Sequence, residues 1–521
     1  MQKGKYITTT LPYANSKPHI GHAFEFIIAD AIVRFFKFSG YGNEINSDVF
    51  FNIGLDEHGL KIQEAAEKQG ISPQEYVDNL EEVWIDFLEQ LQIRSYDSFY
   101  RTSDKEHGLK VQHFWKEALE RGDIYKKKYK GKYCVGCESF KSNRELEEKS
   151  VFGVDPALDD PEVQSNKILI CPDHPTTPLQ EVEEENYFFK LSKYKNKLSV
   201  WAYKSVDFIE PKSKRAEFLK FIDSIEDISI SRDSKKVKWG VPVPEDSTQT
   251  IYVWFDALLN YLFAVGYKSD IPAAFDVIWN DCDVIQICGP DNIKFQSVIF
   301  QGLLESAGIK HTDKLLVHGT ILDSNGRKMS KTLGNVVDPI DQAGKYGISA
   351  VRYYALAGIT TYGNSGWDES RLVELHNSHL SDDFGNLIAR VSHLAGKILE
   401  ENSNNPNIKL DYSYLDGDRF KAFFDIEVES IERRWEKYKV SEALQETNLL
   451  VKSLNKKIND DKPWSKGAEG WISILELHYA LTKINDLYYP VFPHKSGKIR
   501  KSLKDCKKAI IFPKLELKQE V

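Results

Sequence analysis

The chain has 521 residues, which is too long for one compact core and predicts about two to four domains. Hydrophobic residues make up 41% of it and charged residues 28%, a composition that excludes a disordered or fibrous protein. No apolar run is long enough to span a bilayer, and the first residues form no hydrophobic signal region, so we expect a cytoplasmic protein. The formal net charge of −9 argues against indiscriminate nucleic-acid binding, although a local basic surface could still contact RNA.

Two lysine-rich runs are candidates for such a surface, residues 126–132 and residues 235–238. Solvated lysine faces explain either run at least as well when it is taken alone.

The first residues predict a strand, a loop and a helix. Residues 6–11 are rich in β-branched side chains and end at a proline, as a short strand does. Turn-forming residues follow, and from Ile20 apolar side chains recur at helical spacing until Gly40 and Gly42. A second strand is expected from residue 48 to 53. This strand–helix–strand order is typical of a parallel nucleotide-binding sheet.

The sheet is predicted to resume late in the chain, with strands at residues 251–255, 283–288 and 314–320. Residues 115–231 change from basic to acidic composition and contain paired cysteines, so we interpret them as an insertion. The expected fold class is therefore α/β: a doubly wound, parallel, Rossmann-like domain formed by residues 1–114 and 232–320, interrupted by the insertion. Residues 321–375 connect it to an all-α helical bundle over residues 376–521.

The first chemical motif is His19-Ile20-Gly21-His22, at the start of the predicted helix. A helix N-terminus offers unpaired N–H groups to a phosphate, and two imidazoles there could stabilise charge on it. Gly21 would let an adenosine approach the backbone. Two histidines at a helix start are nevertheless more often structural, so the motif alone is weak evidence.

The second motif is Lys328-Met329-Ser330-Lys331-Thr332, in a loop that follows a late strand. Two lysines on such a loop could close over a triphosphate, although a lysine-bearing loop is usually a solvated surface. Both motifs would lie at the carboxyl ends of strands in one sheet, which is where such sheets bind nucleotides.

Together the motifs resemble the HIGH and KMSKS signatures of class I aminoacyl-tRNA synthetases, with Thr332 in place of the last serine. Longer strings resemble the methionyl-tRNA synthetase family in particular. They are LPYAN at residues 11–15, GLDEHG at 54–59, ISR at 230–232, WGVPVP at 239–244 and YVWFDA at 252–257.

The resemblance implies an enzyme that activates L-methionine with ATP to methionyl-adenylate and transfers it to tRNA(Met). It assigns residues 321–375 to the signature loop and a region that contacts the tRNA stem. It implies catalytic residues His19, His22, Lys328 and Lys331, ATP binding by Gly21, Asp291 and the same two lysines, and Mg²⁺ with the nucleotide. The alternatives are a synthetase for another amino acid and a tRNA-binding paralogue that has lost catalysis. The chain shows no large editing insertion and no extra oligonucleotide-binding module, so we expect a monomer.

The resemblance also implies a methionine pocket. Asp56 would hold the substrate ammonium by a charge-assisted contact. The lining would be Leu11, Tyr13, Trp254, Leu258, Tyr261 and Phe295, large groups suited to a thioether. Two positions depart from the family pattern, because Gln296 replaces a histidine and Pro290 replaces a lysine. Glutamine keeps a donor and an acceptor but cannot become cationic, so we expect altered selectivity. Without the family pattern, each aromatic residue would be assigned to the core.

Four residues in two pairs have the spacing of a zinc site: Cys134 with Cys137, and Cys171 with His174. Three thiolates and one imidazole complete a tetrahedral set, which predicts one structural Zn²⁺. The gap between the pairs is longer than in common fingers, and the alternative is two unrelated turns with reduced cysteines. The family carries a zinc knuckle in this insertion.

The helical part resembles the anticodon-binding bundle of the family. Asn386 and Arg390 lie one helical turn apart, and Trp464 follows a proline in a connector. An amide, a guanidinium and an indole can hydrogen-bond to and stack on splayed anticodon bases. Without the resemblance, Asn386 and Arg390 would be surface residues and Trp464 would lie at the edge of the core.

Overall fold

A parallel sheet lies at the centre of the computed structural model, which describes residues 3–38, 48–135, 139–141, 146–150, 167–172, 177–269, 272–329, 334–405 and 407–518. Within these residues six strands follow the order β3-β2-β1-β13-β14-β9, and every neighbouring pair is parallel. The strands are β1 (Lys5–Thr8), β2 (Val49–Leu55), β3 (Ser98–Arg101), β9 (Ile209–Glu210), β13 (Asp283–Cys288) and β14 (Lys314–Val317). The predicted parallel sheet is confirmed, and its strand order reverses between β1 and β13.

The sheet is buried on both faces. Ile7 and Phe51 point into one apolar core, which helix α1 (Ile20–Lys37) shares. Tyr6 points into the other core, which helix α10 (Phe300–Ala307) shares. Successive side chains of a strand point to opposite faces, so burial on both sides explains the nearly continuous apolar runs in the sequence.

Further helices surround this sheet or connect it to the rest of the chain. They are α2 (Leu60–Gln69), α3 (Pro73–Gln90), α4 (Lys105–Glu120), α5 (Lys195–Lys204), α6 (Arg215–Asp223), α8 (Asn260–Phe263), α9 (Pro272–Phe275), α11 (Pro339–Tyr346) and α12 (Ile348–Tyr353).

One predicted strand is wrong. Residues 251–255 do not join the central sheet, because β12 (Gln249–Ile251) pairs antiparallel with β11 (Ser231–Asp233) and helix α7 (Val253–Leu258) follows at once. An apolar run of five residues fits a buried helix as well as a strand, so its pattern could not decide. Strand β9 lies in the range predicted as an insertion, yet it pairs with β14 at the edge of the sheet.

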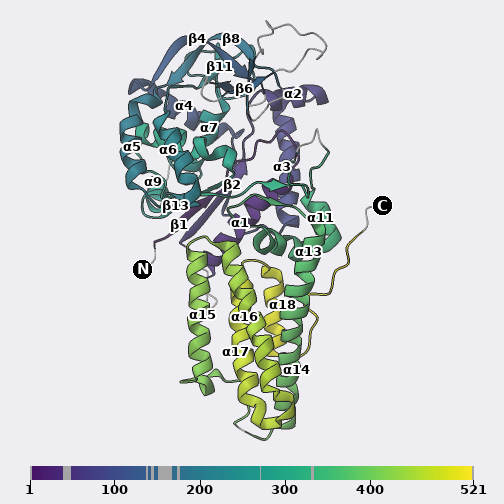
Figure 1. Cartoon of the computed structure of the whole chain (residues 1–521). Helices are drawn as coiled ribbons and strands as arrows, with labels where there is room; N and C mark the ends of the chain where they lie inside the picture. The colour runs from purple at the N-terminus through teal and green to yellow at the C-terminus, as the bar shows by residue number, and fades with distance from the viewer. Residues whose placement is uncertain are drawn as a thin grey trace, which may run out of the picture.

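The inserted stretch contains a separate antiparallel sheet at the end of the molecule opposite the helical bundle (Figure 1). Its long pair is β4 (Ile124–Cys134) and β8 (Gln180–Phe189), flanked by β5 (Ser139–Lys141) and β10 (Ile228–Ser229). The first lysine-rich run lies on β4, where Lys128, Lys130 and Lys132 face Glu185, Glu183 and Glu181 of β8. Opposite charges directly across a strand pair attract, so these three lysines are partly neutralised.

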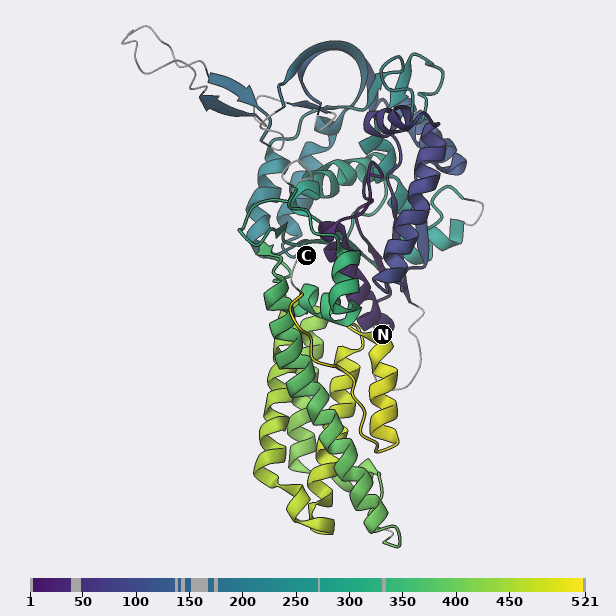
Figure 2. The same ribbon diagram turned by 90° about the vertical axis from the view of Figure 1, so that its right-hand side faces the viewer.

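The C-terminal part is a bundle of helices, as predicted. It comprises α14 (Asn386–Glu401), α15 (Arg419–Glu436), α16 (Val440–Asp461), α17 (Trp471–Tyr488) and α18 (Pro493–Lys504), and α13 (Glu369–Leu375) leads into α14. After α18 the chain runs back beside the bundle toward the α/β part (Figure 2), where Asn377 exchanges two hydrogen bonds with the backbone of Leu515. No helix within the described residues is both long and apolar enough to cross a membrane.

A buried ion pair joins the bundle to the sheet domain. The guanidinium of Arg352, on α12, donates to the Asp30 carboxylate of α1 at 2.6 Å, and both side chains are fully buried. Arg352 also donates to the carbonyl oxygens of Val491 and Pro490, at 2.7 and 3.0 Å, just after α17. Arg34 donates to the same carboxylate at 2.8 Å. One charged centre therefore fixes three distant segments of the chain against each other.

Candidate active site

The two histidines of the first motif form the N-terminal cap of α1. Nδ1 of His19 accepts from the backbone N–H of Gly21 at 3.1 Å, and Nδ1 of His22 accepts from the backbone N–H of His19 at 3.3 Å. The two rings stack with centroids 3.8 Å apart. A neutral imidazole that accepts at Nδ1 carries its hydrogen on Nε2, so both rings present a donor at that atom. A Cβ on Gly21 would lie 2.9 Å from the His19 ring, so glycine is needed for the cap itself.

The segment that follows the lysine loop contacts this helix start. The backbone N–H of Ile20 donates to the carbonyl of Val337 at 3.2 Å, which joins the HIGH-like motif to the segment after the loop. At the near side of the loop, Nζ of Lys328 is 3.3 Å from the Asp291 carboxylate, just beyond strand β13. Lys331 lies outside the described residues, as do Ser330 and Thr332.

The approach to the loop is a small hairpin built on Asp323. Its carboxylate accepts from the Asn335 amide, from the Arg327 guanidinium and from two backbone N–H groups. The hydrogen bonds from Asn335 and Arg327 hold the pKa of Asp323 at about 2, so it remains ionised at neutral pH. The hairpin fixes where the loop begins.

Four of the predicted pocket residues, Leu11, Leu258, Tyr261 and Phe295, lie within or against the apolar cluster that includes Tyr6, and Trp254 joins them through its stack on Phe295. The rings of Trp254 and Phe295 stack with centroids 4.0 Å apart. Tyr261 and Gln296 are buried, and the Gln296 amide donates to the Tyr261 hydroxyl at 2.7 Å.

Tyr13 and Asp56 meet where β1 and β2 end. Ala14 N–H donates to the Asp56 carbonyl at 2.8 Å, and Asp56 N–H donates to the Pro12 carbonyl at 2.9 Å. These bonds extend the parallel pairing beyond the two strands and bring Tyr13 opposite Asp56. The Asp56 side chain is buried beside the loop that contains Tyr13 and leads into the HIGH-like motif.

Comparison with known proteins agrees with this geometry. The profile of the family described as tRNA synthetases class I (M) matches residues 5–392. The chain belongs to the class I methionyl-tRNA synthetases. A methionine–tRNA ligase of Thermotoga maritima is 36% identical over 500 residues, covering 95% of this chain and 74% of the relative. The relative from Caldanaerobacter subterraneus is 35% identical over 511 residues, covering 96% and 74%.

A solved structure supports the same family. The Mycobacterium tuberculosis methionyl-tRNA synthetase in complex with methionyl-adenylate has a TM-score of 0.83 and 30% sequence identity to this chain. The match covers 98% of this chain and 100% of that one. The similarity therefore extends through the sheet domain and the bundle.

Two of the four predicted zinc ligands lie together. Cys134 at the end of β4 and Cys171 just after β7 (Lys167–Ile170) are both buried, and they share a small cluster with Leu146. Cys137 and His174 lie outside the described residues, so the complete set stays a prediction.

Two of the three predicted anticodon residues also meet. The Arg390 guanidinium lies 5.6 Å from the centre of the Trp464 ring and donates to the Asn459 side chain at 2.9 Å. Trp464 is 47% exposed. Asn386 is exposed on the same helix as Arg390, one turn before it.

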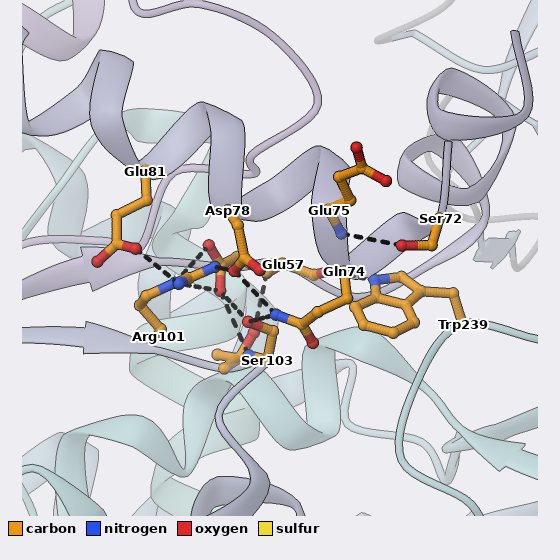
Figure 3. Close-up of polar contacts among 10 residues, drawn as sticks. Glu57, Ser72, Gln74, Glu75, Asp78, Glu81, Arg101, Ser103 and Trp239 are labelled. Atoms are coloured by element: carbon orange, nitrogen blue, oxygen red, sulfur yellow. Dashed lines mark hydrogen bonds and ion pairs between the residues drawn. The ribbon is translucent and has the colours of Figure 1, made fainter. Parts of the chain in front are cut away.

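Sequence reasoning missed the network that holds the GLDEHG loop (Figure 3). Nε of Arg101 donates to both carboxylate oxygens of Glu57, at 3.0 Å each, and its other nitrogens reach Asp78 and Glu81 on α3 at 2.7 Å. Ser103 donates to Glu57 at 2.6 Å. Burial raises the pKa of Glu57, and the bonds from Ser103 and Arg101 limit that rise. Glu57 belongs to the GLDEHG string of the sequence, whereas no motif of the sequence includes Arg101.

A second missed network joins the helix of the HIGH-like motif to the residues that follow strands β1 and β14. Glu25 of α1 accepts from the Thr10 hydroxyl at 2.6 Å and lies 2.9 Å from Nε2 of His318, which follows β14. The sequence gives one sign of this network: Glu25 lies among apolar residues of the predicted helix, and a buried carboxylate needs polar partners.

We expect Arg101→Gln to lower the free energy of unfolding by about 3 kcal/mol, because the fully buried Glu57 carboxylate loses its counter-charge. Urea unfolding measures this. Lys130→Gln is the control, because its pair with Glu181 is exposed on both sides and should change stability by less than about 0.5 kcal/mol. Equal effects of the two substitutions would contradict the role given to Arg101.

Proposed function

We propose that the chain is an active methionine–tRNA ligase, which forms methionyl-adenylate from L-methionine and MgATP and then transfers methionine to the 3′ end of tRNA(Met). The observation that supports it most is the hydrogen bond from Ile20 to Val337, because it joins the segment that follows the lysine loop to the start of the helix that carries the two histidines. A tRNA-binding paralogue without catalysis is disfavoured, because the chain keeps both histidines of the first motif and both lysines of the second.

The nucleotide would bind where the strand order reverses, between the ends of β1 and β13. His19 and His22 would donate from Nε2 to the reacting phosphate, where charge develops during attack by the methionine carboxylate. Lys328 and Lys331 would neutralise the departing pyrophosphate, and Asp291 would contact the ribose. Gly21 would leave room for the nucleotide, and a side chain there would also crowd the His19 ring. No side-chain nucleophile is needed.

The methionine side chain would lie against the stacked pair of Trp254 and Phe295, with Leu11, Tyr13, Leu258, Tyr261 and Gln296 completing the pocket. Asp56 would bind the ammonium, since its carboxylate is buried beside Tyr13 and a charge-assisted bond is strong there. The Glu57–Arg101 network would keep the Asp56 loop in place.

The insertion would hold one structural Zn²⁺ on Cys134, Cys137, Cys171 and His174. The two described thiols support this, because strands far apart in the sequence bring them into one buried cluster. Zinc bound there would cross-link the ends of the hairpin strands.

The bundle would recognise the anticodon through Asn386, Arg390 and Trp464. The half-exposed indole, backed by the guanidinium of Arg390, offers a stacking face for a splayed base, and Asn386 offers an amide one turn away.

Methionine-dependent exchange of labelled pyrophosphate into ATP should be observed with the unaltered protein. We expect His22→Ala to lower kcat of this exchange on the order of 100-fold with little change in KM for methionine, because the imidazole would act mainly in the transition state. His113→Ala, an exposed histidine paired only with Glu117 among the described residues, is the control. No exchange with any amino acid would refute the proposed activity, and exchange with another amino acid would refute its substrate.

The purified protein should contain one equivalent of zinc by elemental analysis. We expect Cys134→Ser to lose the metal and to lower the temperature at which the insertion unfolds, because zinc binding contributes folding energy. Cys506→Ser removes a buried thiol in another domain and should retain the metal. Protein without zinc would overturn this assignment.

We expect Arg390→Ala and Trp464→Ala each to lower kcat/KM for tRNA(Met) by about 10- to 100-fold, since each would lose a stacking or hydrogen-bonding contact with a base. Pyrophosphate exchange should stay within about twofold, because no tRNA takes part in it. Arg433→Ala is the control, as this arginine pairs with Glu429 elsewhere on the bundle. An equal loss in the control would point to general charge instead of base recognition.

A further inference from the structure

A buried pair of side chains ties the loop that carries Asp56 to the helix that carries Trp254. Nδ1 of His58 lies 2.9 Å from the Asp256 carboxylate, and the two side chains are 9% and 0% exposed. His58 follows Asp56 by two residues, and Asp256 follows Trp254 by two residues on α7. The pair therefore joins the segment proposed to bind the substrate ammonium to the segment proposed to bind the substrate side chain.

Helix α7 needs such a contact to fix its orientation. It has six residues, too few for a helix to be stable by itself. Trp254 and Leu258 lie one turn apart on one face of α7, and Asp256, halfway between them in sequence, lies on the opposite face. Apolar packing is non-directional, whereas a hydrogen bond to a fully buried carboxylate has a preferred geometry. The bond to Asp256 therefore restricts rotation of α7 about its axis.

The backbone of the Asp56 loop is held from another side by Trp239. The indole N–H of Trp239 donates to the Glu57 carbonyl at 2.5 Å, and the Trp239 carbonyl accepts from the Gly59 N–H at 3.0 Å. The Trp239 ring meets the His58 imidazole at 66°, with centroids 5.4 Å apart. These contacts fix the loop and the direction of the imidazole, but none of them reaches α7. The bond between His58 and Asp256 adds that link.

We propose that His58 and Asp256 are positioning residues, which set the separation between the Asp56 carboxylate and the Trp254 face of the methionine pocket. This rests on the proposed function and deepens it. A substrate whose side chain lies against Trp254 reaches Asp56 with its ammonium only at one separation, because hydrogen bonds weaken steeply with poor geometry.

The contact holds for either protonation state of the imidazole, since Nδ1 can donate in both. Burial raises the pKa of Asp256, and His58 opposes that rise. Loss of the imidazole would therefore favour the neutral acid, and α7 would lose its link to the Asp56 loop.

The test compares KM for methionine with KM for ATP in pyrophosphate exchange. We expect His58→Leu, which is similar in bulk but has no donor, to raise KM for methionine about 10- to 100-fold, as expected for the loss of a charge-assisted bond to the ammonium. KM for ATP should stay within about twofold, because the proposed phosphate site lies at the start of α1. His58→Asn can place an amide N–H near the position of Nδ1 and should restore KM for methionine to within about threefold.

Equilibrium dialysis with labelled methionine and no ATP should show the same order of affinities. If His58→Leu fails to fold, Asp256→Asn keeps the volume and removes the charge, and it should raise KM for methionine about fivefold. A merely structural effect would reduce the number of active molecules and would lower kcat with both KM values unchanged.

His478→Leu is the matched control. Its imidazole is also buried and bonds to the Tyr412 hydroxyl and the Leu503 carbonyl within the bundle, so its loss should lower stability and leave both KM values unchanged. A folded His58→Leu protein with unchanged KM for methionine overturns the inference, as does a His58→Asn protein no better than His58→Leu. In both cases methionine-dependent exchange by the unaltered protein still supports the function, whereas absence of that exchange refutes the function itself.

Discussion

The arrangement of the whole molecule depends on the buried ion pair between Asp30 and Arg352. Two charges with no exposed surface are costly to remove from water, and only good geometry with further hydrogen bonds offsets that cost. Here the further bonds are the backbone carbonyls after α17 and the guanidinium of Arg34. Because each partner needs the other in place, the pair permits one relative placement of α1, α12 and the end of the bundle.

Helix α1 is thereby shared by two functional regions. Its first turn carries the histidine cap, and Asp30 lies ten residues further on, about 15 Å along the axis. Near its end Phe35 stacks on Trp435 of the bundle with centroids 5.4 Å apart. The bundle therefore packs on the same helix that carries the two histidines of the HIGH-like motif at its start.

The sequence correctly predicted the elements that a local residue pattern determines. Strand β13 and the start of α1 were placed correctly, because flanking residues and helical spacing mark them. The strand predicted at residues 251–255 was wrong, because five apolar residues fit a buried helix equally well. The residues that orient the site could not be found, since Arg101 lies 44 positions from Glu57 and Arg352 lies 322 positions from Asp30. Their pairing is a property of the folded chain alone.

Which lysines can bind a phosphate depends on which of them already pair with a carboxylate. Lys128, Lys130 and Lys132 of β4 lie opposite glutamates, so they are poorly placed to bind phosphate. Lys328 is different, because its pair with Asp291 is 67% and 70% exposed at 3.3 Å, and such a pair contributes only about 0–1 kcal/mol. A triphosphate carries more charge than one carboxylate, so it would displace Asp291 from Lys328 at little cost. The weak pair would keep the lysine close to the proposed nucleotide site without opposing its transfer to the substrate.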